Sequence, residues 1–305
     1  MTVKRIINAI PGLLRLLAIS VSLSVSLTGC LKDDLDGCDD KHTLTVRAYD
    51  HAGTELSRRE VEEVMLYVFD SDLCFVERIN THVGRTVTLN APRGEEIHVV
   101  GWGNLDSGQQ SYTQHEAGSH KDYHYVRLLP HTRVMSYSLS PADLFRGEIT
   151  LSGGSGGNGS NSENTLPIHR ETGSMAITVR GLITFAGHAD HNYSIEVRET
   201  PSVVDFYGNL SGNKVAYRPT GSFTIGASNE EYYVPPFNLL PEASGIHVDI
   251  YHGTDLVTTI SRDSAGDPIV VEKGKLTNVL VDFRTSLNVS VALTPWGEEQ
   301  LWKEF

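Results

Sequence analysis

The chain has 305 residues and a formal net charge of −13. At about 100 to 200 residues per domain, this length suits one large or two medium domains. The acidic balance excludes binding of nucleic acid or of anionic lipid headgroups through the surface as a whole, because both need an excess of lysine and arginine.

Residues 1–29 have the layout of a secretory signal peptide. They carry Lys4, Arg5 and Arg15 and no acid, and an apolar stretch then runs from Leu16 to Leu27. This stretch is shorter than the roughly 20 residues that a membrane-spanning helix needs. We therefore expect export and removal of the signal, which makes the mature chain, residues 30–305, more negative by three charges.

The segment Leu27-Thr28-Gly29-Cys30 resembles the lipobox of bacterial lipoproteins. In that family the thiolate attacks a lipid donor and gains a diacylglyceryl group, a peptidase cuts before the cysteine, and the new amine is acylated. The resemblance implies cleavage between Gly29 and Cys30, and a covalent diacylglycerol and N-acyl lipid on Cys30. Several acyl chains, at about 0.8 kcal/mol per buried CH₂, make a stable anchor. The alternative is a plain signal peptide with an unrelated cysteine.

Residues 30–42 read as an acidic stem that carries the lipid, with aspartates at positions 33, 34, 36, 39 and 40. Such a run of charges is typical of a solvated linker. Acidic residues just after a lipidated cysteine also resemble the surface-export signal of Bacteroidetes lipoproteins. That resemblance implies a lipid-anchored protein on the outer face of the outer membrane.

Two further cysteines remain, Cys38 in the stem and Cys74 behind a predicted strand. In an exported chain this pair could form a disulfide that ties the stem to the first sheet. The alternative is two separate thiols, one of them buried in a strand. No CxxC or metal-type spacing occurs.

Strand patterns with a period of two fill most of the remaining chain. Leu44, Val46 and Ala48 alternate with polar residues, as in a strand with one buried face. The run from Val64 to Phe69 is apolar on both faces, which is typical of a central strand covered on both sides. The polar region from Asp106 to Tyr125 gives no clear element.

One stretch interrupts this pattern: residues 152–164 are mostly glycine, serine and asparagine and predict a flexible loop or linker. Short strands on each side of it predict an all-β fold of two tandem antiparallel β-sandwiches. The expected boundaries are 43–151 for the N-terminal sandwich, 165–295 for the C-terminal sandwich, and 296–305 for a tail.

The glycine-rich stretch also matches two catalytic patterns. The segment from Gly153 to Gly157 fits G-x-S-x-G, and Gly154, Gly156 and Gly159 fit G-x-G-x-x-G. Both motifs need a helix directly afterwards, to expose the serine or to bind phosphate at its N-terminus. The residues that follow start no helix with an apolar face, so a linker is the better interpretation.

Histidines and aspartates offer no clear metal site. His115, His120, His124 and His131 lack a helix signature and an accompanying cysteine or glutamate, so we expect a solvated loop. Asp70-Ser71-Asp72 lacks the remaining ligands of a calcium loop and is interpreted as a strand-end turn. Without a set of catalytic residues, we expect no enzyme and no metal or other cofactor besides the covalent lipid.

Several loose motifs together resemble a known family, the FimB-like fimbrillin-associated anchor lipoproteins of Bacteroidetes. They lie in the stem, at the first central strand and its turn, at the next two strands, around the start of the second half, and near the end: Cys30 with Asp33-Asp34-Leu35 and Cys38; Val64 to Asp70; Phe75-Val76; Leu89 to Gly94; Val99 to Asn104; Leu166-Pro167; His169-Arg170; Gly173 to Val179; Val289 to Trp296. Cys74, where the family usually has a glycine, and the glycine–serine insertion depart from the pattern.

The resemblance implies two transthyretin-like β-sandwiches and a non-catalytic role as the anchor or an accessory subunit of a fimbrium. Its expected partners are fimbrial shaft or accessory subunits and, through the lipid, the outer membrane; it is expected to attach the shaft and limit its length. Subunits of this kind join by strand exchange, in which an added strand pairs with an open sheet edge.

The alternation of Leu287, Val289, Val291 and Leu293 suits such an exchanged strand. An ordinary closing strand of the second sandwich is the favoured alternative. Trp296 and Trp302 either pack back on the domain or contact a partner. Two other functions stay open: a surface glycan-binding lipoprotein of a polysaccharide-uptake system, which needs exposed aromatic platforms, and a lipid-tethered hydrolase, which needs a convergent catalytic set.

Overall fold

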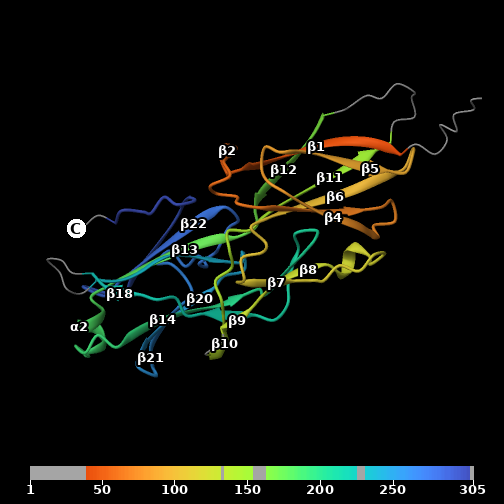
Figure 1. Ribbon diagram of the computed structural model, residues 1–305. Coiled ribbons are helices and arrows are strands. Elements are labelled where there is room, and N and C mark those ends of the chain that lie inside the picture. Colours follow the sequence, from red (N-terminus) through yellow and green to blue (C-terminus); the bar gives the residue numbers. More distant parts are fainter. Residues whose placement is uncertain (1–38, 132–133, 154–162, 225–230, 303–305) are drawn as a thin grey trace, which may run out of the picture. The chain divides into compact units, whose positions relative to one another are not determined.

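The computed structural model describes residues 39–131, 134–153, 163–224 and 231–302 (Figure 1). Within these ranges nearly all regular structure is β-strand, in four sheets, which confirms the predicted all-β fold. The two helical segments are short: the 3₁₀ turn η2 (Lys121–Tyr123) and the helix α2 (Leu182–Ala186).

The first half forms an eight-stranded sheet that encloses its own core. The strand order is β2 (Glu55–Leu56), β1 (Asp40–Tyr49), β12 (Glu163–Arg170), β11 (Phe145–Ser152), β6 (Glu96–Gly103), β3 (Val64–Phe69) and β4 (Phe75–Thr81), with β5 (Thr86–Ala91) paired to β1. Leu44, Val46 and Ala48 of β1 pack into the same core as Leu66 and Val68 of β3, and none is more than 1% exposed.

Strand β12 corrects the predicted boundary between the halves. It pairs in parallel with β1, from Thr43↔Glu163 to Tyr49↔His169, and its Leu166 and Ile168 are fully buried in the first core. Residues 165–170 therefore belong to the first sandwich rather than the second, and the predicted linker 152–164 joins two strands of one sheet. The alternation predicted a strand here but could not identify its partner. Residues 154–162 of that linker lie outside the described residues.

The second half contains two sheets that face each other across a core. One has the order β18 (Ser222–Phe223), β19 (Glu231–Leu239), β13 (Gly173–Arg180), β22 (Lys275–Asp282) and β23 (Asn288–Pro295); the other has the order β21 (Asp255–Ile260), β20 (His247–His252), β14 (Tyr193–Thr200), β17 (Val215–Tyr217), β10 (Val134–Ser138) and β9 (Pro130–His131). Ile177 of β13 and Ile195 of β14 are both fully buried in that core.

The halves are joined by more than the chain that links them. Strand β10 of the first half pairs with β17 of the second through Tyr137↔Ala216. A fourth sheet has the order β16 (Leu210–Ser211), β15 (Val203–Asp205), β8 (Tyr125–Leu128) and β7 (Gln110–Tyr112), so it also takes strands from both halves. The prediction of sandwiches in simple tandem therefore missed this exchange of strands.

Most strand pairs are antiparallel, as predicted, but three are parallel: β1 with β12, β13 with β22, and β10 with β17. Parallel neighbours need long connections, because the chain has to return to the same end of the sheet. The intervening strands provide these connections. Period-two alternation is the same for both kinds of pairing, so the sequence pattern could not distinguish them.

Close packing between β11 and β12 depends on Gly147. A Cβ placed on Gly147 would lie 1.9 Å from the carbonyl oxygen of Pro167, which is far inside contact distance. Since that carbonyl points toward β11, the nitrogen of Pro167, which has no hydrogen, points to the same side and away from β1. Proline is therefore tolerated here without loss of a bond to β1.

Gly147→Ala should lower the free energy of unfolding by more than about 2 kcal/mol, because the methyl group would force two backbones apart. Denaturant unfolding of the purified mature chain measures the change. The exposed Thr150→Ala on the same strand is the control; it removes one exposed hydrogen bond, between Thr150 Oγ1 and His98 Nδ1 at 2.9 Å, and should cost about 1 kcal/mol or less. Equal stability of Gly147→Ala and wild type would contradict the packing described.

Candidate functional site

Strand β23 forms one edge of its sheet and contains the segment predicted for strand exchange. It pairs with β22 in antiparallel register from Lys275↔Pro295 to Asp282↔Asn288, and no other strand of the described residues pairs with it. The structure thus places it as a closing strand of the second sandwich, the favoured alternative. Its use in strand exchange stays a prediction.

Only the middle of this edge is open. The N–H of Val289 donates to Ser264 Oγ at 2.8 Å, and its carbonyl accepts from the Ser264 N–H at 2.9 Å. Because backbone groups alternate in direction along a strand, Val291 and Leu293 also direct their N–H and C=O groups outward. The Pro295 carbonyl accepts from Glu298 N–H. Among the described residues, the groups of Val291 and Leu293 have no hydrogen-bond partner, so they can pair with an added strand.

The alternation places the four apolar residues of this segment on one face, but only the two in the middle are covered. Val289 is 6% exposed and Val291 is partly buried, and both pack against the core. Leu293 is 39% exposed and Leu287, just before the strand, is 53% exposed. An open edge with exposed leucines is an unusual surface for a protein without a partner, because unpaired strands promote association.

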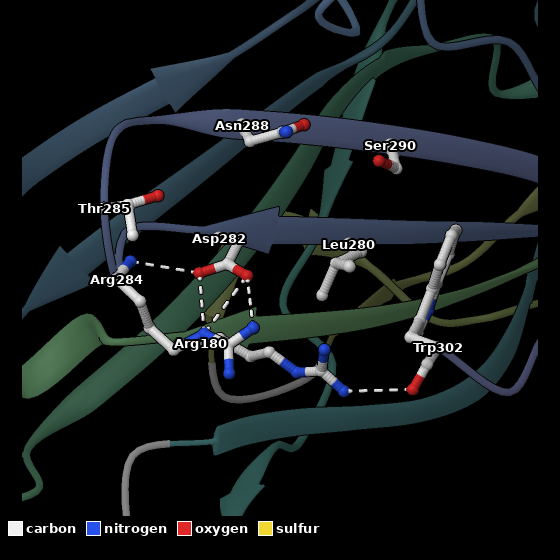
Figure 2. A pocket seen from close by; sticks show the side chains of 8 residues that line it. All are labelled: Arg180, Leu280, Asp282, Arg284, Thr285, Asn288, Ser290 and Trp302. Atoms are coloured by element: carbon white, nitrogen blue, oxygen red, sulfur yellow. Dashed lines mark hydrogen bonds and ion pairs between the residues drawn. The ribbon is translucent and has the colours of Figure 1, made fainter. Parts of the chain in front are cut away.

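A groove of about 690 Å³ lies beside this edge on the same sheet (Figure 2). Three charged residues line it: Arg180, Asp282 and Arg284. The other lining residues are Leu280, Thr285, Asn288, Ser290 and Trp302. Hydrogen bonds from Arg284, the shortest at 2.7 Å, lower the pKa of Asp282. Arg180 is paired with Glu231 at 2.9 Å. The charges in the groove are thus paired, which argues against a site for a strongly charged ligand.

The tail folds back onto both sandwiches, through Asn278 and Arg180 of the second and through Arg170 of β12 in the first. Gln300 N–H donates to Asn278 Oδ1 at 3.1 Å, and Arg180 Nη2 donates to the Trp302 carbonyl at 3.3 Å. The Trp296 ring lies 4.6 Å from the Arg170 guanidinium. The structure therefore selects packing on the domain for both tryptophans, the first of the two alternatives.

The anchor residues predicted from the sequence have a different status. Gly29, Cys30 and Cys38 lie outside the described residues, so lipidation and the Cys38–Cys74 disulfide stay predictions. Cys74 is half-buried, and its thiol carries no disulfide within the part of the chain that the structure describes. No helix among the described residues is long and apolar enough to cross a membrane.

Asp70 has the structural role expected of a strand-end turn. Its Oδ1 accepts hydrogen bonds from the N–H groups of Asp72, at 3.0 Å, and Cys74, at 2.8 Å. The described residues contain no group of three or more histidine, cysteine, aspartate or glutamate side chains placed to hold a metal ion. The glycine motif is followed by strand β12 rather than by the helix that either catalytic pattern requires.

Two of the four histidines contradict the expected solvated loop. His115 and His124 stack with ring centroids 4.4 Å apart and planes 8° apart, and His124 has no exposed surface. Tyr67, Phe75 and Phe206 surround them. Spacing in the sequence gave no sign of this, because the aromatic neighbours come from distant strands.

The histidine pair has little capacity for catalysis. Ser119 Oγ lies 2.9 Å from His124 Nε2, the arrangement of a nucleophile and its base. However, His124 Nδ1 has no hydrogen-bond partner within the described ranges, so no acid orients the imidazole. Full burial of His124 also keeps substrate away.

The histidine pair should make the fold sensitive to acid. Burial and the neighbouring His124 lower the pKa of His115 to about 3, and burial also lowers the pKa of His124. The unfolded chain binds these protons near pH 6.5, so the free energy of unfolding should fall as the pH is lowered from about 7 toward 4. His115→Phe should reduce this slope, as measured by denaturant unfolding across that range.

Val99→Ala, in the first core and without a titratable group, is the control for this experiment: it should lower the free energy of unfolding by the same amount at every pH. A slope unchanged by His115→Phe would show that this imidazole takes up its proton at the same pH in the folded and the unfolded protein.

The facing β-sheets and the open β23 edge define a β-sandwich protein with a strand edge available for pairing. The chain belongs to the family described as fimbrillin-A associated anchor proteins Mfa1 and Mfa2, whose model matches residues 35–302.

The chain is similar in sequence to one anchoring subunit and in fold to two solved proteins. The major fimbrium anchoring subunit FimB of Porphyromonas gingivalis (strain ATCC BAA-308 / W83) is 28% identical over 296 residues, which is 91% of this chain and 93% of FimB. The solved fimbrial anchor protein Mfa2 from Porphyromonas gingivalis shares the fold with a TM-score of 0.60 at 11% identity, covering 85% of this chain and 98% of Mfa2. A Bacteroides ovatus protein proposed to be an adhesin has a TM-score of 0.63 at 14% identity, covering 88% and 97%.

Proposed function

We propose that this chain is an outer-membrane lipoprotein that anchors a fimbrium, with its lipid on Cys30 in the membrane and a fimbrial subunit paired to the edge of β23. The observation that carries the proposal is the open edge at Val291 and Leu293, with exposed leucines beside it. Membership of an anchor-protein family and the name of the FimB relative support the same role.

The contact with a fimbrial subunit would consist mainly of backbone hydrogen bonds. Val291 and Leu293 offer two N–H and two C=O groups, and an extended segment of the partner would pair with them. Leu293 and Leu287 would then lose water-exposed apolar surface, which adds about 25 cal/mol per Å² buried. Such a contact needs neither catalysis nor a metal ion.

The glycan-binding alternative receives less support. It requires exposed aromatic platforms, but Trp102 is fully buried and Trp296 stacks with Arg170. Trp302 borders the groove, and a bound sugar ring would have to stack on the face of its indole. One partly covered tryptophan is a weaker basis for glycan binding than the open edge is for strand pairing.

Deleting the gene tests the anchor role, with electron microscopy of the cells and of their medium as the measurement. We expect long fimbriae shed into the medium. Complementation with Cys30→Ser should leave the precursor unprocessed and unacylated and the fimbriae still shed, because the thiolate is the acyl acceptor. Unchanged fimbriae together with lost growth on a polysaccharide would overturn the anchor role in favour of glycan binding.

Leu293→Pro tests the β23 edge directly. Proline removes an N–H that points outward, so the variant should fold normally, while binding to purified shaft subunit should weaken by about tenfold or more. Ala292→Pro is the matched contrast: its N–H faces β22, so its loss should lower the melting temperature. Undiminished subunit binding by a folded Leu293→Pro protein would place the contact elsewhere.

A further inference from the structure

We propose that β1 and β12 form a mechanical clamp that holds the folded body to its membrane tether under tension. The inference rests on the proposed lipid at Cys30. Asp40 begins β1 only ten residues after Cys30. By chain connectivity, a pull on Cys30 therefore reaches the described structure at Asp39 and passes directly into β1.

Strand β1 is held on both sides along its length. Seven residues pair in parallel with β12, from Thr43 to Tyr49, and six pair in antiparallel register with β5, from Asp40 to Thr45. Extracting β1 would break both ladders.

Burial strengthens this hold. The inward side chains Leu44, Val46 and Ala48 have no exposed surface, and Leu166 and Ile168 of β12 lie in the same core. Sliding the strands past each other would move these side chains out of their packing sites.

The direction of the load gives the pair its resistance. Tension enters β1 at its N-terminal end, and it leaves β12 at the C-terminal end, where Arg170 leads through two residues into β13. Parallel strands pulled from opposite ends are loaded along the strand axis, so all of their hydrogen bonds share the force. If the same strands were pulled apart from one end, the bonds would break one after another. Figure 1 shows β1, β12 and β11 side by side.

The second half is connected to the first by this strand exit, by the β10–β17 and β8–β15 pairs and by a common core, so it lies beyond β1 on the load path. An added fimbrial strand on β23 would pull on that half. In an anchor, the force between shaft and membrane would therefore cross the β1–β12 pair. If β1 and its neighbour were instead pulled apart from the same end, their hydrogen bonds would break one after another, and the tether would be released at a lower force.

The test is single-molecule force spectroscopy of the mature chain, residues 30–305, with one handle on the Cys30 thiol and Cys38 and Cys74 changed to serine. With the second handle at the C-terminus, β1 is sheared against β12. With the second handle at an introduced Ser152→Cys, β1 is peeled from its N-terminal end, because the end of β11 lies beside the start of β1. A Cβ on Gly153 would be 2.6 Å from Asp40 Oδ2.

At the same pulling rate, we expect the unfolding force to be about twofold or more higher in the shearing arrangement, since forced rupture reports the unfolding barrier. Equal forces, or a lower force in the shearing arrangement, would overturn the clamp. The two proteins differ only at Ser152→Cys, an exposed position at the end of β11, so equal denaturant midpoints exclude a difference in stability as the cause.

A pair of matched variants isolates the contribution of β1. Val46→Ala on β1 and Val99→Ala on β6 remove the same atoms from fully buried positions in one core. Both should lower the denaturant midpoint similarly, but only Val46→Ala should lower the shearing force. A similar force loss in both variants would mean that general core stability sets the force. This outcome would overturn the clamp and leave the anchor role intact, because anchoring is tested separately by Cys30→Ser in cells.

Discussion

Double burial of β3 is the constraint on which the rest of the structure depends. Leu66 and Val68 face the first core, whereas Tyr67 and Phe69 face the second, and none is more than 1% exposed. Each such side chain contributes about 1.5 to 3 kcal/mol when buried. The sheet that contains β3 therefore borders both cores. The halves cannot separate without exposing the aromatic side chains of β3 to water.

This construction suits a protein that transmits force between two attachment points. The proposed lipid leads into β1, which is paired on both sides, and the proposed partner site is at β23 near the other end of the chain. Strands exchanged between the halves, and a core continuous through both, join these points. The β23 edge is kept short by Ser264, which limits unwanted pairing while leaving Val291 and Leu293 available.

The histidines show how a tertiary environment changes the meaning of a sequence. His115 and His124 lie in a polar stretch, but Phe75 and Phe206 from distant parts of the chain enclose them in an aromatic cavity. Burial without full hydrogen bonding makes the neutral imidazole the stable form. Composition alone could not distinguish a buried histidine from an exposed one, because histidine occurs in both environments.

The sequence by itself predicted the export signal and the lipobox, which lie outside the described residues, and it determined the all-β class, the double burial of Val64–Phe69 and the strand character of the β23 segment. These features follow from local patterns of charge, size and period-two alternation. The tertiary structure decided which strands pair: that β12 joins β1, that β10 and β15 cross between the halves, and that along the β23 edge, among the described residues, Val291 and Leu293 leave their backbone groups open. Pairing depends on contacts between residues far apart in the chain, and alternation is the same whichever neighbour a strand selects.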